Sequence, residues 1–66
     1  MKSWEDIKVG SVLLVRNKYA VGYYLEVRVL KISPSGRYVK IQYVDSERIE
    51  WVPKDELDIV EVLYTP

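Results

Sequence analysis

The chain has 66 residues, of which 48% are hydrophobic, and its ten basic and ten acidic side chains give a formal net charge of zero. This length suits a single domain over residues 1–66, with a core from about residue 7 to residue 63, and zero net charge argues against a protein that coats duplex nucleic acid by neutralising phosphates. The absence of cysteine and histidine removes disulfides, most transition-metal sites and the commonest nucleophile–base pairs.

These absences predict a non-catalytic protein that binds neither a metal nor a cofactor. No apolar run approaches the roughly 18 to 20 residues of a membrane span, and no apolar segment of a secretory signal follows Met1. We therefore expect an intracellular, cytoplasmic protein without membrane association. With 30% charged residues, and with Asn17 and Gln42 as the only amides, the composition also resembles that of thermophile proteins.

The first residues predict a short turn, one buried strand and a loop. Ser3 and Asp6 form a variant of the capping box, which favours one helical turn or an extended lead-in. Trp4 in this turn is expected to cover one end of the core, with stacking on a ligand as the alternative. Residues 12–15, Val-Leu-Leu-Val, are apolar on both faces and predict a buried strand. The polar residues 16–22 then predict a loop, where binding residues often occur.

Residues 23–32 predict the longest strand. Its first half alternates apolar and polar side chains, with Leu25 and Val27 on the buried face. The alternation slips at Leu30, and such a phase change within a strand indicates a β-bulge. The sequence Ser-Pro-Ser-Gly at 33–36 predicts a tight turn after this strand.

A hairpin follows the turn. Residues 37–44 alternate apolar and polar side chains, the Asp-Ser pair at 45–46 favours chain reversal, and residues 47–52 form the returning strand. We expect Tyr43 and Trp51 to pack on the core face of this hairpin.

The remaining residues predict a second turn and a last strand. Pro53 cannot continue a central strand because it has no backbone N–H. Residues 53–57 therefore predict one 3₁₀ turn, and residues 58–63 predict the last strand. The whole pattern predicts an all-β fold, a five-stranded SH3-like barrel with a 3₁₀ turn before the last strand.

Three stretches resemble one protein family. Residues 7–11 (Ile-Lys-Val-Gly-Ser), 41–46 (Ile-Gln-Tyr-Val-Asp-Ser) and 50–57 (Glu-Trp-Val-Pro-Lys-Asp-Glu-Leu) are similar to the opening, the third strand with its turn, and the closing segment of Tudor-type domains. The last stretch also resembles the end of chromo-barrel (Tudor-knot) domains. The resemblance covers roughly residues 7–57. It implies a Tudor-like barrel that binds methylated lysine or arginine in an aromatic cage through cation–π attraction.

The resemblance also implies where the cage would lie. Tyr23 or Tyr24 matches the aromatic at the start of the second strand, and Tyr43 matches the one at the end of the third, followed by the acidic Asp45. The other two aromatic positions hold other residues here, namely Arg16 and Asn17 at the first and Ser46 and Ile49 at the second. An arginine there would repel a methylated cation, and Tyr19 is the available loop substitute.

Charged residues form two further sets. The basic residues Arg28, Lys31, Arg37 and Lys40 are expected at outward positions together with Glu26, Gln42 and Glu50. Cross-strand pairs between these two groups are the expected arrangement. The acidic residues near the C-terminus are Asp55, Glu56, Asp58 and Glu61. They make that end negative, and their spacing lacks the central glycine of a calcium loop.

The candidate binding surface combines the predicted loop and the hairpin turn. Its residues are Arg16, Lys18, Tyr19, Tyr23, Tyr24, Tyr43, Asp45 and Ser46. We expect a binding or adaptor module that recognises a protein or peptide through this tyrosine-rich end. One alternative is single-stranded RNA or DNA bound by the same tyrosine, arginine and lysine side chains. Another is a homodimer that buries the tyrosine-rich patch.

Overall fold

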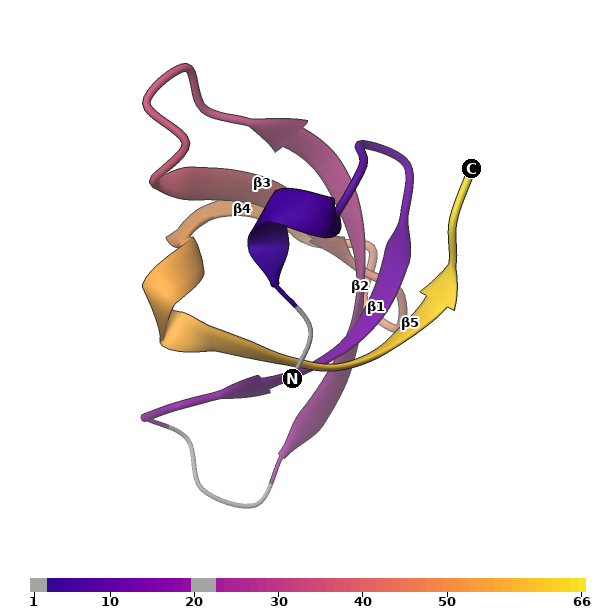
Figure 1. The fold of residues 1–66 in the computed structure, drawn as a ribbon. Helices are drawn as coiled ribbons and strands as arrows, with labels where there is room; N and C mark the ends of the chain where they lie inside the picture. Colours follow the sequence, from indigo (N-terminus) through magenta and orange to yellow (C-terminus); the bar gives the residue numbers. More distant parts are fainter. Residues whose placement is uncertain (1–2, 20–22) are drawn as a thin grey trace.

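One antiparallel sheet contains most of the chain (Figure 1). The structure is a computed structural model and describes residues 3–19 and 23–66, so residues 20–22 of the predicted loop lie outside the described part. The strands are β1 (Val12–Asn17), β2 (Tyr24–Ile32), β3 (Tyr38–Tyr43), β4 (Ile49–Pro53) and β5 (Leu57–Tyr64). Two 3₁₀ turns, η1 (Trp4–Asp6) and η2 (Lys54–Glu56), complete the elements of this part of the chain, which contains no α-helix.

The strand order is β4-β3-β2-β1-β5, and η2 directly precedes β5. The all-β fold of five antiparallel strands with a 3₁₀ turn before the last strand is thereby confirmed. Figure 1 shows that the sheet is strongly curled and that η1 lies across one end of it. The described residues extend over 30 × 22 × 20 Å.

The core follows the alternation of apolar residues along the strands. The side chains with no exposed surface among the strand residues are Leu13, Val15, Val27, Val29, Val39 and Ile41. Their positions agree with the strand register, in which Leu13 lies opposite Val27 and Val29 lies opposite Ile41. Residues directly opposite in antiparallel strands share a face, so these side chains meet on the concave side. Most of these core residues are β-branched, and β-branched side chains pack well on a pleated sheet.

The N-terminal turn closes one end of this core. The Ser3 hydroxyl accepts a hydrogen bond from the Glu5 N–H at 3.3 Å and caps η1. Trp4 packs against the core cluster, and its indole Nε1 donates to the Leu57 carbonyl at 3.3 Å. The predicted helical turn and the packing role of Trp4 are both confirmed.

The predicted β-bulge lies in β2. The register of β2 against β3 shifts between Val29 and Lys31, so Leu30 is the extra residue. As a result Lys31 lies opposite Lys40. The turn that follows is also as predicted, because Gly36 has a φ of 75° and its N–H donates to the Ser33 carbonyl at 2.9 Å.

The expected packing role of Trp51 is wrong. Its side chain is 48% exposed, whereas the neighbouring Val52 is buried and lies opposite Val39. The register against β3 sets the faces of β4, and it turns Trp51 outward next to Lys40. Tyr43 does pack partly buried against the core, as expected.

The expected ion pairs of the outward basic residues are also wrong. Glu50 lies opposite Ile41 and therefore shares the concave face with the core. The ion pairs formed by residues 3–19 and 23–66 are Arg16–Asp58, Lys18–Asp58 and Arg48–Glu50. None of them includes the four basic residues predicted to pair across the strands. Within that set, Arg28 does lie directly opposite the amide of Gln42.

Candidate functional site

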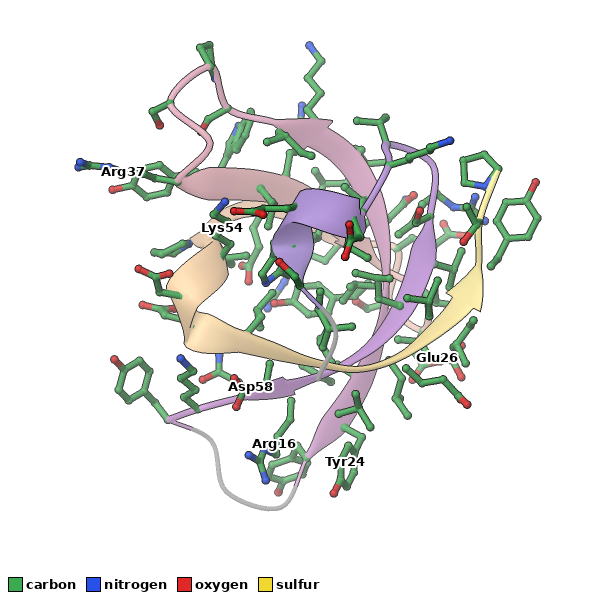
Figure 2. The ribbon with its side chains drawn as sticks, in the orientation of Figure 1. Arg16, Tyr24, Glu26, Arg37, Lys54 and Asp58 are labelled. Atoms are coloured by element: carbon green, nitrogen blue, oxygen red, sulfur yellow. The ribbon has the colours of Figure 1, made fainter. Side chains whose placement is uncertain are left out.

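The predicted loop residues gather around an acidic residue of β5. Arg16 lies between Tyr24 on β2 and Asp58 on β5 in the strand register. Its Nη2 donates to Asp58 Oδ2 at 3.3 Å, and Lys18 Nζ lies 3.8 Å from Asp58 Oδ1. Figure 2 shows Arg16, Tyr24 and Asp58 close together at one end of the sheet. A single carboxylate thus pairs with two cations, and the cluster keeps one net positive charge.

Three tyrosines at this end point their rings into solvent. The exposed fractions are 59% for Tyr24, 67% for Tyr23 and 79% for Tyr19. The backbone before Tyr19 is held by a local turn, in which Asn17 Oδ1 accepts from the Tyr19 N–H at 2.9 Å. We call Tyr19, Tyr23, Tyr24 and the Arg16–Asp58 pair the tyrosine end.

An open cavity adjoins the tyrosine end. It has a volume of about 330 Å³ and is lined by Arg16, Tyr24, Asp58, Ile59 and Val60. Val60 is 45% exposed. The cavity therefore combines an aromatic ring and an aliphatic wall with an ion pair whose groups remain free for further hydrogen bonds.

The hairpin residues of the predicted site form a second group. Tyr43, Asp45 and Ser46 line an open cavity of about 310 Å³ together with Arg48 from the returning chain. The guanidinium carbon of Arg48 lies 5.3 Å from the centre of the Tyr43 ring, a cation–π contact. The Tyr43 hydroxyl donates to Glu50 Oε1 at 2.5 Å, and Arg48 Nη2 lies 3.7 Å from Glu50 Oε2.

This arrangement defines the state of Tyr43. Partial burial raises the pKa of its phenol above 10.0, and the hydrogen bond to Glu50 raises it further, against a lowering by Arg48. The phenol is therefore a neutral donor at physiological pH. Arg48 thus lies over the ring of Tyr43, where it makes the cation–π contact that a ligand cation would otherwise make.

The structure thus divides the predicted site between two places. Arg16, Lys18 and Tyr24 meet at Asp58, whereas Tyr43, Asp45 and Ser46 surround the second cavity. The two places are connected through β2, where the Glu26 carbonyl accepts from the Val44 N–H at 3.0 Å.

Sequence reasoning missed Asp58, Val60, Arg48 and Glu50 as site residues. Asp58 lies 42 positions from Arg16 along the chain, and only the pairing of β1 with β5 brings them together. Alternation places Glu50 on the face opposite to Ile49 and Trp51, but only the register with β3 shows that this face is the concave one.

Comparison of the chain with family models, with curated proteins and with solved structures found no match. Residues 3–19 and 23–66 contain no cluster of acidic side chains placed to hold a metal ion. In the same described part, no helix has the length and apolar character needed to cross a membrane.

Proposed function

We propose that the chain is a non-catalytic, intracellular binding module that takes a peptide segment of a protein partner at the tyrosine end. The observation that carries this proposal is the 59% exposed ring of Tyr24 beside an open cavity whose cation is already paired with Asp58. Exposed tyrosines with a polar tip are common at protein interfaces, because the ring gains contact area at a small cost in side-chain entropy.

Charge compensation favours a peptide over a phosphate backbone at this end. Arg16 and Lys18 both contact Asp58, which is 37% exposed in its side chain. A phosphate would have to compete with that carboxylate for both cations. A peptide needs no such exchange, because its carbonyl groups can accept from the outer N–H groups of Arg16 while the ion pair stays in place.

The edge of the sheet offers a second means of holding an extended peptide. β5 is the last strand in the order and pairs with β1 on one side. No further strand of the described sheet pairs with the other edge of β5, so an added strand could hydrogen-bond there while an apolar side chain enters the cavity against Tyr24 and Val60. The expected ligand is therefore an extended segment with an aliphatic or aromatic residue.

The family resemblance supports the fold of the proposed module but not its ligand. The strand order and the 3₁₀ turn before β5 support a Tudor-like or chromo-barrel relationship. A methylated lysine is not part of the proposal, because Arg48 lies over Tyr43 at the second cavity. We expect a trimethyl-lysine peptide to leave the NMR signals of Tyr43 and Arg48 unchanged.

A peptide selection tests the proposal. Random peptides displayed on phage are selected on the wild-type chain, and the selected sequences are measured against Tyr24→Ala and against Tyr64→Ala. Tyr64 is a matched control because it is 55% exposed and lies at the far end of β5. We expect Tyr24→Ala to weaken binding by about tenfold or more and Tyr64→Ala to leave it within about twofold.

Two results would contradict the proposal. One is a set of selected peptides whose affinity does not change with Tyr24→Ala. The other is a mass measurement showing a stable dimer that Tyr24→Ala dissociates, since the tyrosine end would then serve self-association.

A further inference from the structure

A second exposed surface lies on the convex side of β2, β3 and β4, which run side by side (Figure 1). The register places Lys31 opposite Lys40 and Lys40 opposite Trp51, in one row across the three strands. A neighbouring row contains Arg28, Gln42 and Ile49. The basic sheet face is our name for the surface formed by Arg28, Lys31, Tyr38, Lys40, Ile49 and Trp51.

The charges of this face are uncompensated within the described residues. None of its three cations takes part in an ion pair formed by residues 3–19 and 23–66. Glu50 of β4 faces the core, so the rows contain no carboxylate. Like charges directly opposite in a sheet are destabilising. An anion bound between Lys31 and Lys40 would offset their repulsion, which gives a physical reason for this arrangement.

The β-bulge produces this opposition. In an uninterrupted strand Lys31 would follow the outward Leu30 and point to the core side. The extra residue in β2 restores Lys31 to the outward row beside Lys40. Bulges often re-aim a side chain in this way next to binding sites.

Aromatic and aliphatic side chains lie beside the cations. Trp51 and Ile49 are each 48% exposed, and Tyr38 is 47% exposed. Trp51 lies directly opposite Lys40 across the strand pair. It belongs to β4, which is an edge strand of the described sheet. Cations next to exposed rings are the combination that holds a phosphate backbone while bases stack.

We propose that the basic sheet face binds single-stranded nucleic acid, with phosphates on Lys31 and Lys40 and a base stacked on Trp51. Arg28 is a weaker contact, because it shares a small cavity with Glu47. A purely acidic peptide would use the lysines but leave the exposed rings without a partner. A duplex would bury its bases away from Trp51, so the face fits a single strand best.

The zero net charge of the chain does not oppose this proposal, because no acidic residue lies in the row of Lys31, Lys40 and Trp51. On the same convex side, Glu61 lies on β5, and Glu26 lies on β2 two positions before Arg28; both lie opposite Leu14. The face is separate from the tyrosine end, so each surface can be tested without the other.

Fluorescence anisotropy with a labelled dodecamer of deoxythymidine tests the proposal on the full chain. We expect saturable binding that weakens by about tenfold between 50 and 200 mM salt, because two or three phosphate contacts release that many counterions from the nucleic acid on binding. Trp51→Ala should weaken binding by about tenfold, and Trp51→Phe should retain most of it because stacking is preserved. Lys40→Gln should weaken binding and lower the salt dependence, whereas Lys18→Gln at the tyrosine end should change neither.

Three outcomes would overturn the proposal. They are an affinity that Trp51→Ala leaves unchanged, equally tight binding of a polyglutamate peptide, and tighter binding of a duplex of the same length. Trp51 is exposed and Lys40 is partly buried, so an unchanged amide NMR spectrum outside the face is needed to confirm that each variant is folded.

Discussion

At the scale of single residues, Tyr43 matches a predicted binding position but contributes to the packing of the core. Its ring packs against the core, its hydroxyl donates to Glu50, and Arg48 lies over its outer face. Glu50 is a half-buried carboxylate on the concave side, and the phenol and the guanidinium are its partners. These three residues therefore form a small polar network at the end of the core.

Removing the Tyr43 hydroxyl should destabilise the protein. Tyr43→Phe leaves Glu50 without its phenol donor, and we expect a loss of about 1 to 2 kcal/mol in the free energy of unfolding, measured by urea denaturation. Tyr38→Phe is the control, because the Tyr38 hydroxyl forms no hydrogen bond with residues 3–19 and 23–66 and Tyr38 is 47% exposed. Equal stability of wild type and Tyr43→Phe would show that the network contributes nothing.

The same pair of proteins gives a pH dependence with a defined sign. The pKa of Tyr43 is raised above 10.0 in the folded state, so folding favours the protonated phenol. This contribution is fully present below pH 10 and is lost as the pH rises through the folded-state pKa. The stability difference between wild type and Tyr43→Phe should therefore shrink as the pH rises above about 10, and a difference that grows would contradict the assigned direction.

At the scale of elements, the strands follow the alternation of the sequence, and the turns at Gly10 and Gly36 use the positive φ that glycine allows. Leu13 on β1 is fully buried, whereas Leu63 near the end of β5 is 43% exposed. Because both are leucines in strands, any difference between the effects of their substitution reports burial and not strand propensity.

Truncation of these two leucines should have very different effects. We expect Leu13→Ala to cost about 2 to 5 kcal/mol, because a cavity forms in the core, and Leu63→Ala to cost less than about 1 kcal/mol. Small domains have only about 0.05 to 0.15 kcal/mol of stability per residue, so Leu13→Ala should bring the thermal midpoint close to room temperature. Circular dichroism melting measures both, and similar midpoints would contradict the described core.

The turn between β2 and β3 depends on one left-handed residue. Gly36 has a φ of +75°, and a Cβ added there would meet only Lys54 Nζ at 4.0 Å. The cost of a substitution is therefore conformational. We expect Gly36→Ala to lose about 1 to 2 kcal/mol and Gly36→Asn to lose less, since asparagine tolerates this region. Denaturant unfolding should rank them in that order, and equal losses would indicate a steric cause.

At the scale of the whole molecule, balanced composition conceals an uneven distribution of charge. Asp58 compensates Arg16 and Lys18 at the tyrosine end, whereas Lys31 and Lys40 oppose each other on the convex face. The zero net charge argued against a protein that coats duplex nucleic acid, but net charge averages over surfaces that the fold separates.

The opposed lysines should reduce the stability of the free protein. We expect Lys31→Gln to raise the free energy of unfolding by about 0.2 to 1 kcal/mol at low ionic strength and to lose this gain near 1 M salt, where the Debye length is about 3 Å. Lys8→Gln is the control, because Lys8 is exposed and precedes the strands. A destabilised Lys31→Gln protein would mean that the lysine stem packs favourably on the sheet.

The sequence by itself determined the order and type of the elements, including the bulge at Leu30 and the turn at Gly36, although Arg16, Asn17 and Pro53, expected outside the strands, belong to β1 and β4. These features depend on local alternation and backbone preference, which a short stretch of chain already contains. The tertiary structure alone decided that Trp51 faces outward, that Asp58 meets Arg16, and that Lys31 meets Lys40. Each of these depends on strand register, in which a shift of one residue reverses every face. Register is set by packing across strands far apart in the chain, and local sequence does not contain it.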